Sequence, residues 1–168
     1  MEAEASTKME QIVDWRSAII AGLVAGLVFL LAEMIGRAAV TGGSPWIAVR
    51  YIAAIVMGEN VLPPPPTFDA VIFVVALLVN FVLAVIFSMI LAAIIHEWEL
   101  VVGIVIGALF GLAIYAINYY TFTRFFPWFF PVRNWTDILS HILFGAVAGG
   151  VYEALERERF VPVHEDID

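Results

Sequence analysis

Residues 70–95 read AVIFVVALLVNFVLAVIFSMILAAII, and this stretch decides the fold. It contains no charged side chain, and its only strongly polar members are Asn80 and Ser88. An α-helix rises 1.5 Å per residue, so about 20 apolar residues cross about 30 Å of hydrocarbon. The stretch is therefore long enough to span a bilayer. Three further uncharged blocks resemble it: Ser17–Ala32, which continues through Glu33 to Gly36, Leu100–Thr123, and the shorter Ile138–Tyr152.

The composition of the whole chain agrees with four membrane spans. Of its 168 residues, 62% are hydrophobic and 14% are charged, whereas a soluble domain carries about 25% charged residues. So small a soluble chain could not bury three such blocks. We predict an all-α membrane protein, a four-transmembrane-helix bundle. Its parts are an acidic tail at 1–14, a membrane domain at 15–152 with spans at about 15–40, 69–95, 99–123 and 134–153, and an acidic tail at 154–168.

Charge excludes several classes of partner and site. The net charge is −8, and the acidic residues gather mainly in the two tails, which favours neither nucleic acid nor acidic lipid as a partner. The chain has no cysteine, which excludes disulfides and thiolate metal sites. Its first residues are acidic and no basic segment precedes a short apolar core. We therefore expect the first span to act as its own insertion signal.

Basic residues are divided equally between the two sides of the membrane. Four spans place both termini on one side, and the positive-inside rule assigns the more basic side to the cytoplasm. The side of the termini has Lys8, Arg16, Arg157 and Arg159, and the other side has Arg37, Arg50, Arg124 and Arg133. Pairing or interfacial placement of Arg37 and Arg50 would weaken their contribution. We expect a bacterial inner (plasma) membrane protein with both termini in the cytoplasm.

The first outer connection contains a short helix. Ser44 and Pro45 read as an N-cap followed by proline in the first turn. The apolar stretch 46–57 is too short to span, and Gly58 suits its end, so we predict an interfacial or re-entrant helix. Pro63–Pro66 then favours an extended segment, and Asp69 or Thr67 is expected to cap the next span.

Aromatic side chains dominate the second outer connection, at 119–135. Pro127 and Pro131 prevent this segment from forming a fifth long helix. The pattern is typical of an aromatic belt at the lipid headgroups. A surface that binds lipid or a partner protein is the alternative.

The two halves of the chain share a pattern. Gly22, Gly26, Phe29 and Ala32 recur as Gly103, Gly107, Phe110 and Ala113. Pro45-Trp46 recurs as Pro127-Trp128, and the segment beginning at Asn80 aligns with the one beginning at His141. Each half would comprise two spans. This predicts two parallel two-helix repeats related by an axis along the membrane normal.

Small residues at helical spacing predict close packing between spans. Lipid provides little hydrophobic drive for helix association, and close backbone approach through glycine replaces it. The second span offers Ala84, Ser88 and Ala92 at the same spacing. The glycines of the other spans are Gly22, Gly26, Gly103, Gly107, Gly111, Gly145 and Gly149.

Polar residues in the spans follow the same small-residue faces and form a candidate intramembrane polar cluster. Helical spacing directs them inward, and counting along each span places them in the outer half of the bundle. The members are Glu33, Arg37, Asn80, Asn118 and His141. Three interpretations remain open: bridges between helices, a proton or solute path, and a docking site for a subunit or lipid.

His141 distinguishes these interpretations most clearly. We expect its ring to point into the bundle, near Asn80 or Glu33. If Glu33 is committed to Arg37, His141 should be a neutral hydrogen-bonding bridge. If Glu33 faces His141, the two residues could hold a proton between them.

No catalytic motif is present. His96 and His141 lie at different depths and cannot share a haem iron, and one histidine with one glutamate is too few for a catalytic metal site. We predict no catalytic residues, no metal, no cofactor and no enzymatic activity.

The last span, His141-Ile-Leu-Phe-Gly-Ala-Val-Ala-Gly-Gly-Val-Tyr, and the first, with Ala21-Gly-Leu-Val-Ala-Gly, resemble those of YagU-like small bacterial inner-membrane proteins. Some of these are labelled sodium:proline symporters by automatic transfer. The resemblance covers the four spans and implies a four-helix inner-membrane protein of ill-defined role. It does not imply symport, because a proline symporter is far larger and has broken helices and a cation site. Such chains often have histidine at the position of Asn80.

The leading functional expectation is a non-enzymatic membrane component, either an accessory subunit of a membrane complex or a homo-oligomer. Its partners would be the lipid bilayer and other membrane subunits or copies of itself. The alternative is a small transporter or proton-conducting protein that uses the polar cluster.

Overall fold

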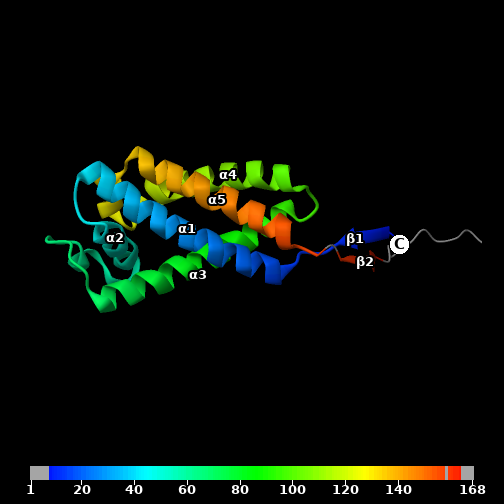
Figure 1. The fold of residues 1–168 in the computed structure, drawn as a ribbon, viewed down its shortest axis with the longest axis horizontal. Coiled ribbons are helices and arrows are strands. Elements are labelled where there is room, and N and C mark those ends of the chain that lie inside the picture. The colour runs from blue at the N-terminus through cyan, green and yellow to red at the C-terminus, as the bar shows by residue number, and fades with distance from the viewer. Residues whose placement is uncertain (1–7, 158, 164–168) are drawn as a thin grey trace, which may run out of the picture.

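The computed structural model describes residues 8–157 and 159–163, and most of them are helical. Within these residues four helices are long and apolar enough to cross a membrane, which confirms the prediction of an all-α membrane protein at this level. They are α1 (Trp15–Thr41), α3 (Ala70–Ile95), α4 (Leu100–Ala116), which continues in tighter or wider turns to Arg124, and α5 (Trp135–Leu155) (Figure 1).

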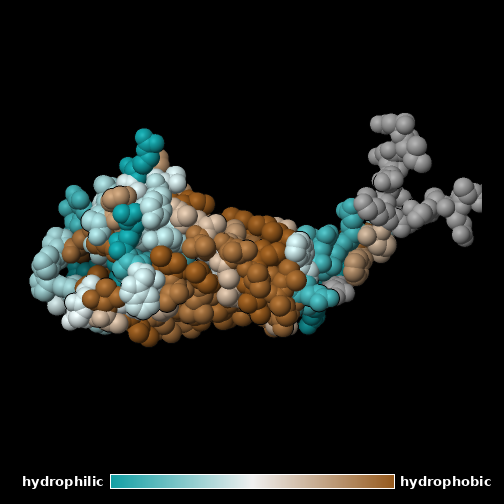
Figure 2. Space-filling view, turned by 90° about the horizontal axis from the view of Figure 1, so that it is seen from above, coloured by the Kyte–Doolittle hydropathy of each residue, from teal (hydrophilic) through white to brown (hydrophobic). Residues whose placement is uncertain are grey.

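The outer surface of the bundle matches a lipid environment. Figure 2 shows a broad hydrophobic band around the long helices, with hydrophilic residues at both ends. On α3 the exposed apolar side chains recur every three or four residues, which places them on one outward stripe. Its members are Val71, Val74, Leu78, Val82, Ile86, Ile90 and Ile94.

The helices pack in the order α4, α5, α1, α3 (Figure 1). The contact between α4 and α5 is backbone against backbone: a Cβ at Gly107 would collide with the carbonyl oxygen of Gly145, and one at Gly149 would collide with that of Gly103. In contrast, α3 and α4 make few contacts beyond the short turn at 96–99 that joins them. The bundle is therefore tightest at α4–α5 and loosest between α3 and α4.

Side-chain hydrogen bonds to the α1 backbone fasten α3 to that helix. Asn80 Nδ2 donates to the carbonyl oxygen of Gly26 at 3.0 Å, and Ser88 Oγ donates to that of Ala18 at 2.8 Å. A Cβ at Gly22 would lie 2.7 Å from Val85 Cα, so the absence of a side chain there permits the approach.

Polar caps explain where α1, α3 and α5 begin. The Asp69 carboxylate accepts hydrogen bonds from the amides of Val71 and Ile72, so Asp69 is the cap of α3. At α5, Asn134 and Asp137 form a reciprocal capping box. Asp14 caps α1: slight burial raises the pKa of its carboxyl, but hydrogen bonds, chiefly from Ser17, outweigh burial and lower the pKa overall.

The first outer connection contains α2 (Trp46–Met57) and a short turn, η1 (Glu59–Val61). We expected Ser44 to be the N-cap of this helix, but the N-cap is the next residue, Pro45. The Ser44 hydroxyl nevertheless accepts a hydrogen bond from the Trp46 amide. Gly58 ends the helix with φ of +79°, a conformation that suits glycine. A face formed by Ala48, Val49, Ala53 and Ala54 is buried, and α2 packs against α1 and α3.

The second outer connection is a chain of short turns. η2 (Ile117–Thr121) is a π-helical widening at the end of α4, and η3 (Phe122–Arg124) and η4 (Pro127–Val132) are 3₁₀ turns.

A pair of strands brings together the two ends of the described part of the chain. β1 (Lys8–Gln11) runs antiparallel to β2 (Phe160–Val163), with Met9 opposite Pro162 (Figure 1). The sequence analysis treated both segments as tails and missed this pair. Strands of four residues carry almost no alternating pattern, and no hairpin turn connects segments so far apart in sequence.

Candidate functional site

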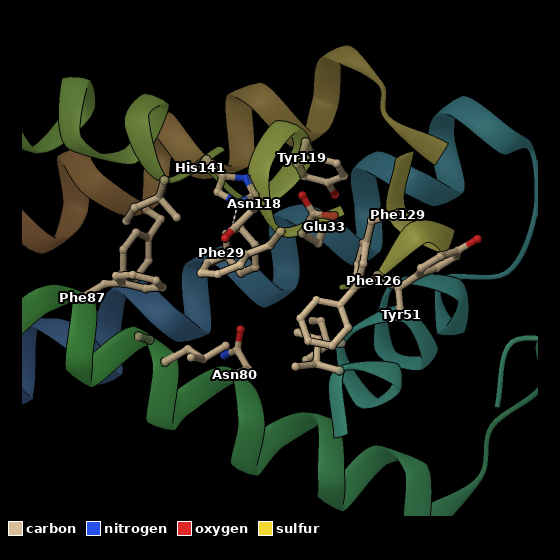
Figure 3. Close-up of a pocket in the computed structure, with 18 of the residues that line it drawn as sticks. Phe29, Glu33, Tyr51, Asn80, Phe87, Asn118, Tyr119, Phe126, Phe129 and His141 are labelled. Carbon is tan, nitrogen blue, oxygen red and sulfur yellow. Dashed lines mark hydrogen bonds between the residues drawn. The ribbon is translucent and has the colours of Figure 1, made fainter. Parts of the chain in front are cut away.

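A cavity of about 320 Å³ lies in the half of the bundle that contains α2, between α3 on one side and α1, α5 and η2 on the other (Figure 3). It is partly open to the outside of the protein. All five members of the predicted polar cluster line it. Apolar and aromatic side chains form most of the remaining wall, among them Phe29, Tyr51, Ile52, Leu83, Phe87, Tyr119, Phe126, Phe129 and Phe144.

Arg37 is at the centre of the polar wall and is only 3% exposed. Its Nε donates to Glu33 Oε2 at 3.1 Å, one helical turn back on α1. Its Nη2 lies 3.0 Å from Asp137 Oδ1 and donates to Tyr119 Oη at 2.9 Å. Nη1 donates to the carbonyl oxygen of Val132 at 3.4 Å. Every guanidinium nitrogen therefore has an acceptor within the protein.

Asp137 belongs to this cluster, and the sequence analysis omitted it. Its side chain is fully buried, and its Oδ2 accepts from the backbone amide of Asn134 while Oδ1 faces Arg37. The carboxyl groups of Asp137 and Glu33 both pair with Arg37. The available signal was spacing: Asp137 precedes His141 by four residues and so shares its inward face.

His141 points into the bundle and is 5% exposed. Its Nδ1 lies 2.7 Å from the carbonyl oxygen of Asp137, which only accepts, so this nitrogen carries a proton. Its Nε2 lies 3.3 Å from Asn118 Nδ2, a donor in the assigned amide orientation (Figure 3). With Nδ1 donating and Nε2 accepting, these two hydrogen bonds fit the neutral form of the imidazole ring. Its observed partner is Asn118, whereas we expected Asn80 or Glu33.

Asn80 lines the opposite wall of the cavity, on α3 (Figure 3). Because its Nδ2 bonds to Gly26, it is structurally committed to the α1–α3 contact. The predicted cluster is thus divided: Glu33 and Arg37 join Asp137, Asn118 joins His141, and Asn80 stands apart across the cavity.

Part of the aromatic connection faces inward. The side chains of Tyr119, Phe122, Phe126 and Phe129 line the cavity, and Tyr119 is 5% exposed. The Tyr119 ring packs edge-on against Phe129 at a centroid distance of 6.0 Å. Phe125, at 71% exposed, and Trp135, at 63%, retain the outward placement expected of an aromatic belt.

The arrangement provides an apolar chamber with charge at one wall. Such a chamber suits a small organic molecule whose apolar body contacts the rings and whose polar end approaches Glu33. Among residues 8–157 and 159–163, no group of three histidine, aspartate or glutamate side chains gathers in a way that would hold a metal ion.

Comparison of the chain with protein-family models, with curated proteins and with solved structures found no match. The resemblance to YagU-like proteins accordingly rests on the glycine-rich segments quoted above, and the function must be argued from the geometry of the cavity.

Proposed function

We propose that this chain is a non-enzymatic multi-pass membrane protein that binds a small, largely apolar molecule in the cavity beside α3, as a small transporter or carrier does. The cavity itself is the observation that supports this proposal. Protein interiors pack densely and rarely leave voids larger than a water molecule. A volume of about 320 Å³ falls instead in the range of ligand pockets, roughly 300–1,000 Å³.

The composition of the cavity wall supports the same proposal. Ligand pockets are lined mainly by apolar and aromatic side chains with a few placed polar groups. Here aromatic rings from α1, α2, α3 and the second connection surround the space, and Glu33, Asn118 and His141 supply polar atoms. The cavity is partly open to the outside of the protein, which gives a small molecule access to it. The expectation of an accessory subunit or homo-oligomer remains a prediction.

Photolabelling tests the proposal. A small apolar diazirine is equilibrated with the protein in bilayer nanodiscs, activated by light, and its sites of insertion are mapped by mass spectrometry. We expect insertion into cavity residues such as Phe87 and Phe126, in addition to uniform labelling of the lipid-facing stripe. Leu83→Trp adds bulk inside the cavity and should abolish the cavity labels.

Val82→Trp is the matched control, because Val82 is the neighbouring residue but faces outward with 57% exposure. It should leave cavity labelling unchanged. Labelling restricted to outward-facing residues in the wild type would contradict the proposal.

We also propose that the protein lies in a bacterial plasma membrane with both termini in the cytoplasm. The engagement of the outer arginines supports this orientation: Arg37 is buried in its ion pairs, Arg50 donates to the carbonyl oxygens of Val61 and Thr67, and Arg133 packs on the ring of Phe130. Arginines held by the protein contribute less to the charge balance that sets topology.

We further propose that α2 is an interfacial helix and that the halves are a repeat. The first proposal is supported by the short length of α2 and by its position at the end of the bundle opposite the β1–β2 pair (Figure 1). Two glycine-faced contacts in corresponding places, α1 on α3 and α4 on α5, support the second.

A further inference from the structure

The charged groups at the cavity wall and directly behind it do not balance. Two carboxyl groups, from Glu33 on α1 and Asp137 on α5, face one guanidinium, that of Arg37. The other polar or titratable side chains that face this group from the packed elements are neutral. They are Tyr51 from α2, Asn80 from α3, Tyr115 from α4, Asn118 and Tyr119 from η2, and His141 from α5. If both carboxyls ionise, one negative charge is left uncompensated in a buried site.

Two carboxyl oxygens also lack hydrogen-bond partners. Glu33 Oε1 and Asp137 Oδ1 are completely buried and neither accepts a hydrogen bond in this structure, although Oδ1 is close to Arg37. Both carboxyl groups pair with the same guanidinium, so one bound proton would cancel the excess charge. Loss of that proton would leave a negative charge beside the cavity, which Glu33 lines with a side chain that is 6% exposed.

We propose that the cavity takes a monovalent organic cation, the ammonium group of a small aromatic or branched amine, whose charge replaces that proton and balances the second carboxylate beside Arg37. This inference rests on the proposed function and names its ligand class.

The rest of the cavity supports this choice of ligand. Aromatic faces attract ammonium groups, and Phe29, Tyr51, Phe126 and Phe129 surround the space. A hydrated inorganic cation would find too few oxygen ligands on an apolar wall. An anion would need the guanidinium, but each nitrogen of Arg37 already has an acceptor in the protein.

Two probes of equal shape separate charge from apolar contact. Benzyltrimethylammonium carries a permanent charge, so any pH dependence of its binding belongs to the protein. Neopentylbenzene replaces its nitrogen by carbon and is neutral. Binding of each to the protein in nanodiscs is measured by equilibrium dialysis at pH 6 to 9, with protein-free nanodiscs to subtract partition into lipid. We expect the cation to bind at least about tenfold more tightly than the neutral probe at pH 8.

The inference also predicts how binding of the cation depends on pH. Because the cation competes with a proton, its affinity should rise with pH, and binding should release protons into weakly buffered solution. Glu33→Gln removes one of the two carboxyl charges and should abolish both the preference for the cation and the proton release. Asp137→Asn should also abolish the preference for the cation and the proton release. Agreement between the two variants would show that the effect does not come from a local structural defect at position 33.

Three controls make each outcome decisive. Glu59→Gln removes an exposed carboxylate outside the cavity and should change nothing. His141→Gln should keep the pH dependence, whereas its loss there would assign the proton to His141 and overturn the inference. Retained neopentylbenzene binding shows that Glu33→Gln is folded. Equal binding of both probes, unaffected by Glu33→Gln, would overturn the cation inference but leave the proposed function standing. Binding of neither probe would overturn both.

Discussion

The polar contacts of the Arg37 side chain connect four segments of the protein. Its guanidinium pairs with Glu33 on its own helix and Asp137 on α5, and donates to Tyr119 on η2 and to Val132 in the second connection. Burying charges is costly, and a buried pair contributes little compared with a well-packed apolar replacement. Removing one partner is different, because it leaves the other charges buried without compensation. Arg37 is therefore best tested by deleting it alone and then together with a partner.

We predict that Arg37→Met lowers the free energy of unfolding by about 3–5 kcal/mol, since it leaves Glu33 and Asp137 facing each other without a cation. Adding Glu33→Gln removes one of those charges and should restore part of the loss. Unfolding in mixed micelles, followed by circular dichroism, measures both effects. Arg124→Met, at an exposed arginine, should change stability by less than about 0.5 kcal/mol. Equal effects of Arg37→Met and Arg124→Met would show that the ion-pair cluster does not stabilise the fold.

Helical spacing brought five polar residues to one cavity, but it did not reveal their pairing. Glu33 and Arg37 are one turn apart, so their contact follows from sequence. Asp137 was not predicted as a cluster member, because a charged residue at the edge of an apolar block usually marks the end of a span. Here it both caps α5 and forms a buried ion pair with Arg37. The inward position of Tyr119 was not predicted, because the aromatic residues around it in the sequence are typical of a belt at the membrane surface. The π-helical widening of η2 is part of the local backbone that carries Asn118 and Tyr119, and no residue pattern signalled it.

At the scale of elements, glycine decides which helices touch closely. On α5, Gly145 and Gly150 are both helical glycines, yet their surroundings differ. A Cβ at Gly145 would collide with the backbone carbonyl of Gly107, which cannot move without shifting α4. A Cβ at Gly150 would lie 3.1 Å from Ile104 Cγ1, part of a side chain that can adjust. Replacing each glycine by alanine changes helix propensity in the same way, but only the replacement at Gly145 disturbs the backbone contact between α4 and α5. Comparing the two variants therefore separates these effects.

We predict that Gly145→Ala destabilises the protein by about 1–3 kcal/mol, the usual cost of adding a methyl group to a closely packed contact. Gly150→Ala should be neutral or slightly stabilising, because alanine is the better helix former by about 1 kcal/mol. Thermal unfolding of the two variants in the same detergent is the measurement. A Gly150→Ala variant as unstable as Gly145→Ala would mean that the backbone contact between α4 and α5 is not the origin of the effect.

Apolar length and polar caps made the long helices predictable, and the shorter elements were harder. The predicted second span began at 69, and α3 begins one residue later because Asp69 caps it. The predicted third span ran through 123, and the regular helix α4 ends at Ala116, beyond which wider and tighter turns continue. Such changes of helical pitch, like the β1–β2 pair, depend on tertiary contacts that local sequence does not encode.

At the scale of the whole molecule, the packing order explains the cavity. The four long helices pack in the order α4, α5, α1, α3, with α4 and α5 in glycine-mediated backbone contact. The terminal members of this order, α3 and α4, make few contacts with each other. The cavity lies beside α3, and α2 and the aromatic turns of the second connection border it (Figure 3). A cavity of this kind arises from unequal contacts among four helices, so single-helix patterns could not predict it.

Both described ends of the chain meet in the β1–β2 pair, at the opposite end of the molecule from α2 (Figure 1). The chain lacks cysteine, so single cysteines report membrane sidedness without background. In intact bacterial cells, we predict that a membrane-impermeant maleimide labels Thr67→Cys and Thr121→Cys, which lie in the two outer connections and are exposed. Val161→Cys, in β2 and 38% exposed, should be labelled only after permeabilisation. The reverse pattern would invert the proposed orientation. Labelling of Thr67→Cys and Thr121→Cys from different sides would contradict an even number of spans between them, and with it the four-span arrangement that builds the cavity.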